Sequence, residues 1–418
     1  MKLWKDIPGL LLVRLLGLGL QLVVQLVVGR LAGPAGLGLL QLFTSWTCVA
    51  GEAAALGRPV HAMRTLAVSR EGAGRSGLDA YLSRQVRAIA APWFVMLIIA
   101  LPVLLQLKRG RFILLVMLAA GGFALLRLFS ESLKALARPA VSVLVETCVP
   151  AIAVLLLCAA LWWTGDAVRG EQLILSMAAG ILLAVLMLAA VLARRLADSR
   201  DQGDAVADAR WSELLPLWGG GLLSILLMQL PFLFLPFYAD VESTGQFALA
   251  YKLVNLVSVV LLLLASLYGP RFASAWRDAP AELSRLLWQS QYSSFALFAA
   301  PALLLLLGGR WLLGLFGAEF VEAQPLLLVL LCGQLINAVT GLPGLLLNMA
   351  GRGRDEFHSL LLSLALASAG CLWLGPAHGA MGIAVAYSGA LAFKNLLSWS
   401  LARRVLRAVP GDAEELIS

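Results

Sequence analysis

Residues 257–267 read VSVVLLLLASL, and residues 300–309 read APALLLLLGG. Neither stretch alternates between polar and apolar residues, as a strand of an outer-membrane barrel would. Each belongs to a longer apolar run. A helix of about 20 apolar residues can cross the hydrocarbon core of a bilayer, because it satisfies its own backbone hydrogen bonds. These stretches therefore predict membrane-spanning α-helices.

The composition extends this prediction to the whole chain of 418 residues. Hydrophobic residues make up 61% of the sequence and charged residues 13%, and the mean hydropathy is +0.88. Ordinary soluble domains contain about 45–50% apolar and about 25% charged residues. A soluble fold of this size could not bury so much apolar surface, which excludes a soluble enzyme, a secreted domain and a disordered chain.

The hydropathy pattern predicts an all-α polytopic membrane protein with about twelve transmembrane helices. The predicted spans are Leu10–Val28, Ala35–Leu56, Ala88–Leu107, Phe112–Ala137, Val143–Trp163, Leu173–Ala193, Leu214–Phe237, Gly245–Leu267, Leu286–Leu307, Pro325–Met349, Phe357–Leu374 and Ala380–Leu401.

A polar segment divides these spans into two groups of six. Residues 194–211 alternate between acidic and basic side chains, which is typical of a solvated linker. We expect a first six-helix half over 1–193, a second over 212–404 and a short tail over 405–418. The two halves show weak sequence similarity. In each half a long helix ends at a proline beside an arginine, and these helices begin with GPAGLGLLQLF at 33–43 and ESTGQFALAYKL at 242–253. Two halves of like topology are typical of transporters.

The basic residues indicate the orientation of the chain. About 22 of the 32 lysines and arginines fall on one side of the predicted spans, and that side is cytoplasmic by the positive-inside rule. Both termini are therefore expected in the cytoplasm. One loop disagrees, because Lys108, Arg109 and Arg111 fall on the other side. The net charge of +8 is thus mostly a signal of topology, and because it is spread over many short loops it does not indicate nucleic-acid binding.

Cysteines and histidines do not indicate a metal or a cofactor. The five cysteines all lie in predicted spans and form no CxxC motif, and the three histidines are scattered. Small buried packing residues are the simplest interpretation of the cysteines.

Ionisable residues within the predicted spans are the candidates for function. Each one costs on the order of 3 kcal/mol near the centre of a bilayer, so such residues are expected to face water, to pair or to reach the interface. Arg127 and Glu131 share one helix face at i, i+4 spacing, and an internal ion pair is the plain alternative to a functional role. The set consists of Arg14, Glu52, Arg127, Glu131, Glu146, Lys252 and Lys394.

These residues suggest two roles. Arg14, Arg127, Lys252 and Lys394 would make a slightly cationic, water-filled cavity that suits a phosphate or diphosphate group. The carboxylates Glu52, Glu131 and Glu146 would pair with these cations or couple transport to an ion. Glu52 and Glu131 are the candidates for proton coupling, because burial raises the pKa of a carboxyl group.

Four segments of the second half resemble the polysaccharide-biosynthesis flippases of the multidrug/oligosaccharidyl-lipid/polysaccharide (MOP) transporter superfamily. They are the helix at 243–276, the Phe-Gly-x-x-Phe-x-x-Ala segment at 316–323, the glycine and basic residues of GLLLNMAGRGRDEF at 344–357, and the Gly-Ala-x-Gly-x-Ala segment at 379–384. In the first half, GLGLLQLFTSW at 36–46 and AALGRPVHAMR at 54–64 are also similar.

The resemblance implies a MOP or MATE-like fold and a transporter rather than an enzyme. The implied substrate is an undecaprenyl-diphosphate-linked oligosaccharide, such as an O-antigen or exopolysaccharide unit, moved across the bacterial inner membrane by alternating access. A coupling proton or sodium ion and neighbouring glycosyltransferases and polymerases would be its partners. The cationic lumen of such flippases transfers to Arg14, Arg127, Lys252 and Lys394 as a hypothesis.

Three alternatives stay open. A drug or metabolite antiporter of the same superfamily is the nearest. A membrane oligosaccharide polymerase or ligase has similar hydropathy but normally carries a large outside loop, which this sequence lacks. A structural scaffold would not explain the charges within the spans.

Overall fold

The computed structural model describes residues 3–69, 75–106, 110–136, 139–197, 206 and 208–407, and in these ranges the regular structure is entirely helical. The helices are α1 (Leu3–Ala55), α2 (Arg58–Ser69), α3 (Arg75–Gln106), α4 (Gly110–Ala135), α5 (Pro139–Thr164), α6 (Gly170–Ala197), α7 (Trp211–Tyr238), α8 (Val241–Asp278), α9 (Glu282–Gly314), η1 (Ala318–Ala323), α10 (Gln324–Thr340), α11 (Pro343–Met349) and α12 (Gly353–Arg407).

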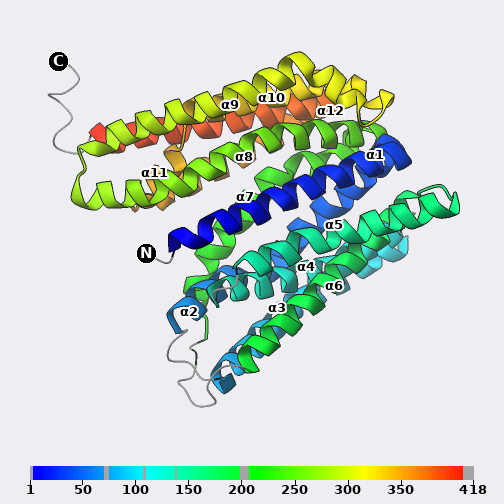
Figure 1. Ribbon diagram of the computed structural model, residues 1–418, viewed down its shortest axis with the longest axis horizontal. Coiled ribbons are helices and arrows are strands. Elements are labelled where there is room, and N and C mark those ends of the chain that lie inside the picture. The colour runs from blue at the N-terminus through cyan, green and yellow to red at the C-terminus, as the bar shows by residue number, and fades with distance from the viewer. Residues whose placement is uncertain are drawn as a thin grey trace. The chain divides into compact units, whose positions relative to one another are not determined.

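The described helices account for the twelve predicted spans. Nine are long and apolar enough to cross a bilayer, and α8, which bends by 44°, makes a tenth. Two of the ten each cover two predicted spans. In Figure 1, α1 leaves the N-terminus, turns at its far end and returns to α2, and α12 starts beside α11 and ends on the same side of its unit. The expected all-α membrane fold is therefore present.

A glycine makes the turn in each of these two long helices. Gly33 has φ 64° and ψ −170°, and Gly379 has φ 54° and ψ −133°. Residues with a Cβ atom rarely adopt a positive φ angle, whereas glycine does so readily. Glycine therefore allows the chain to reverse direction at these two positions. Both turns fall in the short gaps between predicted spans, two residues before Ala35 and one residue before Ala380.

One predicted span differs from the structure. The apolar run Pro325–Met349 is not a single helix, because α10 ends at Thr340 and α11 begins at Pro343. Gly341 between them has φ 75°, and Pro343 starts the next helix. Hydropathy alone could not show this break, since the residues around it are as apolar as those in the helices.

The chain forms two compact units, Met1–Ile225 and Leu226–Ser418. In the first, α4 packs against α1, α2, α3, α5 and α6, with Leu126 and Leu128 in the core. In the second, α10 packs against α8, α9 and α12, and a further core includes Phe272 and Leu346. The boundary between the units lies within α7, later than the expected linker.

Apolar side chains also cover the outside of the helices. On α6, Leu182 and Leu186 are 57% and 59% exposed, and on α9, Leu304 and Leu307 are 73% and 77% exposed. A helix that is apolar on both its packed and its outer face is typical of a membrane span. The chain is therefore a multi-pass membrane protein.

Part of the expected linker 194–211 is held against the first unit. Half of the linker and most of the tail 405–418 lie outside the described residues. Val206 is buried, and Asp208 accepts a hydrogen bond of 2.9 Å from Gln85 Nε2 and pairs with Arg84 at 3.4 Å. Gln85 in turn accepts a bond of 2.7 Å from Arg58, whose burial lowers its pKa. This end of the linker is thus anchored rather than fully solvated.

Candidate functional site

The candidate site is built on one face of α4, in the first unit. The i, i+4 spacing places Arg127 Nη1 3.4 Å from Glu131 Oε1, and Lys134 Nζ lies 2.9 Å from the same oxygen. Glu131 is buried, whereas Arg127 and Lys134 are half-buried. The carboxylate of Glu131 therefore bridges two cations on its own helix.

Helix α5 adds a second carboxylate to this face. Glu146 Oε1 lies 3.7 Å from Arg127 Nη1, and Glu146 Oε2 lies 3.6 Å from Lys134 Nζ. The hydroxyl of Ser130 donates a hydrogen bond to Glu146 Oε2, and Ser142 Oγ donates to the carbonyl oxygen of Ser130 at 2.8 Å. These bonds fix Glu146 between the two cations.

Helix α1 contributes the third carboxylate. Glu52 is 3% exposed, and its Oε2 atom lies 4.0 Å from Arg127 Nε. Neither of these two atoms has a hydrogen-bond partner among the described residues, although both are buried. A Cβ atom at Gly221 of α7 would lie 2.9 Å from Glu52 Oε1, so the absence of a side chain there leaves room for the carboxylate. Glu52 is thus the least tightly held carboxylate of the three.

We name Glu52, Arg127, Glu131, Lys134 and Glu146 the charged network. Arg127 lies within 4.0 Å of all three carboxylates, and three carboxylates against two cations leave one negative charge when every group is ionised. Charges in a low-dielectric interior interact strongly and are costly when uncompensated. The network can therefore take up a cation, or it can release one carboxylate when Arg127 meets another anion.

The second unit holds a separate ion pair. Lys394 Nζ lies 2.6 Å from Glu356 Oε1, and Ser398 Oγ donates to Glu356 Oε2 at 2.7 Å. These residues lie on opposite sides of the turn at Gly379 in α12, so the pair ties the two arms of that helix together. No local spacing relates Lys394 to Glu356, which lies just before the predicted eleventh span.

The structure brings four of the seven predicted residues together within the first unit. Glu52, Arg127, Glu131 and Glu146 are in the charged network, whereas Lys394 pairs with Glu356. Arg14 is exposed on α1, and Lys252 is half-buried on α8. The hydroxyl groups of Ser130 and Ser142 were missed, since serines are common in helix contacts and carry no pattern of their own.

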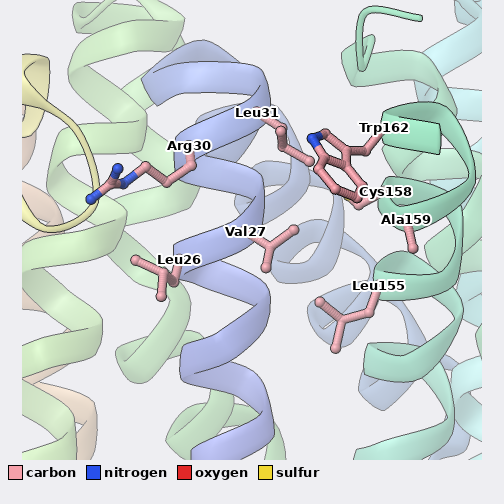
Figure 2. Close-up of a pocket in the computed structure, with 8 residues that line it drawn as sticks. All are labelled: Leu26, Val27, Arg30, Leu31, Leu155, Cys158, Ala159 and Trp162. Atoms are coloured by element: carbon pink, nitrogen blue, oxygen red, sulfur yellow. The ribbon is translucent and has the colours of Figure 1, made fainter. Parts of the chain in front are cut away.

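A groove between α1 and α5 has a different character. Its volume is about 640 Å³, and Figure 2 shows Val27 and Leu31 of α1 facing Leu155 and Trp162 of α5 across it. Among the described residues that line it, Arg30 alone is charged, and its side chain points away from α5. These lining residues include no member of the charged network, so the groove suits hydrocarbon rather than a phosphate group.

The sequence matches the model of a known family over residues 3–276, which is more than half of the chain. The chain belongs to the polysaccharide biosynthesis protein family. The family match covers the three helices of the charged network, α1, α4 and α5, together with α7 and most of α8. No curated protein matches the sequence.

Solved structures of MOP superfamily transporters share the fold over nearly the whole chain. An inward-facing multidrug resistance MATE family transporter matches with a TM-score of 0.74 at 13% identity, over 94% of this chain and 95% of that one. The lipid II flippase MurJ, in an inward closed conformation, matches with a TM-score of 0.71 at 12% identity, over 98% and 95%. A MOP transporter from Pyrococcus furiosus, described as having a binding pocket of reverse polarity, matches with a TM-score of 0.64 at 14% identity, over 97% and 96%.

Proposed function

We propose that the protein flips an undecaprenyl-diphosphate-linked oligosaccharide, such as an O-antigen or exopolysaccharide repeat unit, across the bacterial inner membrane by alternating access. The observation that carries this proposal is the presence of ionisable side chains on the spanning helices of a member of the polysaccharide biosynthesis family. A lipid with a hydrophilic head needs a polar path through the bilayer, and these side chains supply polar groups at the depth where they are otherwise costly.

In this proposal Arg127 alternates between carboxylates and the diphosphate. A guanidinium group binds phosphate oxygens in the same forked geometry with which it binds carboxylates. Glu52 is the carboxylate that Arg127 would release first, because their atoms are 4.0 Å apart and Glu52 Oε2 accepts no hydrogen bond in the described structure. A proton or sodium ion would then compensate Glu52, which links ion binding to substrate binding. Both termini would lie in the cytoplasm, as the distribution of basic residues indicates.

One observation favours a second candidate, a drug or metabolite antiporter. The charged network has more carboxylates than cations, and such a site attracts a cationic ligand rather than an anionic one. Export of a cationic dye by the purified protein would support this candidate.

Reconstitution tests the flippase directly. The purified protein would be placed in vesicles that carry a labelled undecaprenyl-diphosphate-linked oligosaccharide in one leaflet, and transfer would be followed with a reagent that reaches only the outer leaflet. We expect transfer of the glycolipid and no transport of a cationic dye. Dye transport without glycolipid transfer would favour the antiporter.

A further inference from the structure

Three carboxamide side chains meet on α8 and α10 of the second unit. Asn337 Nδ2 donates to Gln334 Oε1 at 3.0 Å, and Gln334 Nε2 donates to Asn255 Oδ1 at 3.5 Å. Gln334 is buried, whereas Asn255 and Asn337 are half-buried. We name these three residues the amide cluster. All of them lie within candidate membrane spans.

The amide cluster is a poor device for holding two helices together. Its single bond from α10 to α8 is 3.5 Å long, at the limit for a hydrogen bond. Elsewhere in this unit, an amide that links two helices bonds to a backbone carbonyl, as Gln291 of α9 does to Thr340 of α10. The amide cluster therefore has hydrogen-bonding capacity that the packing of the helices does not use.

Unused polar atoms of the amide cluster are open to a ligand. Each amide group has two N–H donors and one acceptor oxygen, and the contacts above use only part of this capacity. Asn337 Oδ1 takes no hydrogen bond among the described residues, yet it is not one of the buried polar atoms that lack a partner. This oxygen is therefore accessible. An accessible amide within a spanning helix is stable only beside water or a polar ligand.

A cation lies next to the amide cluster. Lys252 precedes Asn255 by three residues on α8, and side chains at this spacing are neighbours on a helix surface. This stretch of α8 therefore carries a cation beside neutral donors and acceptors. A diphosphate that is esterified to a sugar likewise places a charged group next to neutral hydroxyl groups.

We infer that the amide cluster binds the hydroxyl groups of the sugar attached to the diphosphate. This inference rests on the proposed flippase function and adds to it a site for the glycan. Carboxamides suit this role because each one both donates to and accepts from hydroxyl groups without an ionic charge. The amide cluster would thus decide whether a lipid carries a sugar before it is moved.

The experiment compares two substrates in the vesicle assay. One is undecaprenyl diphosphate with its oligosaccharide, and the other is bare undecaprenyl diphosphate. We expect Asn337→Leu and Asn255→Leu each to slow transfer of the glycolipid by about tenfold, which corresponds to the loss of one or two hydrogen bonds, and to leave transfer of the bare lipid unchanged.

Two controls separate binding from folding. Gln291→Leu removes an interhelical amide whose bond within the described part of the chain is to a backbone carbonyl, so it should change neither transfer rate. Asn337→Ser is smaller and keeps a hydroxyl, so it should fold where leucine does not and should retain part of the sugar preference. Thermal unfolding of each purified variant shows whether it is folded.

The outcomes distinguish this inference from the function on which it rests. A wild-type protein that transfers neither lipid would overturn the flippase proposal and the inference with it. A wild-type protein that prefers the glycolipid would support both, provided that the amide variants lose this preference. If folded Asn337→Leu, Asn255→Leu and Asn337→Ser proteins keep the full preference, or lose both activities equally, the inference alone is wrong.

Discussion

Lys394 and Glu356 form an ion pair of 2.6 Å across the two arms of α12, although the turn at Gly379 separates them in the sequence. Their side chains are only 16% and 11% exposed. A largely buried ion pair holds its two residues together while both charges are present. Removing one charge is destabilising, because the other charge stays buried without compensation. The pair therefore fixes how the two arms lie against each other.

Removing one member of this pair should destabilise the protein. We expect Lys394→Ala to lower the free energy of unfolding by about 3–5 kcal/mol, because Glu356 is left buried without a cation and, among the described residues, keeps the bond from Ser398. The double variant Lys394→Met with Glu356→Gln should recover most of this loss, since it leaves no buried charge. Thermal unfolding in detergent measures both effects. Equal stability of the single and double variants would contradict this account.

Removing Arg127 should also lower the stability of the protein, because its carboxylates lose a cationic partner. Arg127→Ala leaves three carboxylates against Lys134 alone, so we expect lower stability and no glycolipid transfer. Adding Glu52→Gln removes one of the uncompensated charges and should restore part of the stability. Transfer should not return in this double variant, because the guanidinium that would bind the diphosphate is still missing. Full transfer by a stable protein without Arg127 would rule out its proposed role.

The turn at Gly379 should tolerate no side chain. We expect Gly379→Ala to lower the free energy of unfolding by about 1–3 kcal/mol, because alanine at φ 54° is strained and its Cβ atom would lie 3.3 Å from the carbonyl oxygen of Tyr238. Gly389→Ala is the matched control on the same helix, since its Cβ atom meets nothing within 4 Å. The control should keep or slightly raise the stability, as alanine favours a helix more than glycine does. Thermal unfolding of the two variants, side by side, tests this difference.

The start of α8 should make a pH-dependent contribution to stability. Hydrogen bonds from Ser243 hold the pKa of Asp240 below its ordinary value of 3.8, and the Ser243 N–H lies 2.7 Å from Asp240 Oδ1. A lowered carboxyl pKa adds stability that is fully present above the unfolded value and is lost as the pH falls through the folded value. We expect Asp240→Ala to cost about 1 kcal/mol at neutral pH, and this difference should shrink below pH 3.8.

Asp240→Asn separates capping from charge in this prediction. Asparagine also caps helices but does not titrate, so its stability relative to alanine should stay constant with pH. Unfolding curves of the wild type and the two variants over a range of pH values measure this. A constant difference between the wild type and Asp240→Ala across the acidic range would show that the charge contributes nothing.

The sequence alone determined that this is an all-helical membrane protein, because long apolar runs have few stable conformations in a bilayer. Hydropathy also placed the turns at Gly33 and Gly379, since small polar gaps interrupt the apolar runs there. The ion pair of Arg127 with Glu131 could be predicted from the sequence, because both residues lie on one helix face at a fixed spacing. Family membership was visible in the turn motifs, which recur at set places along the chain.

Only the tertiary structure decided which charges meet. Glu52, Glu146 and Glu356 find their partners on other helices or across a turn, and no local spacing encodes such contacts. The same holds for the amide cluster, in which Asn255 and Gln334 come from helices far apart in the sequence. The physical reason is that apolar periodicity specifies which residues form a helix, whereas the packing of helices specifies which polar side chains can satisfy one another.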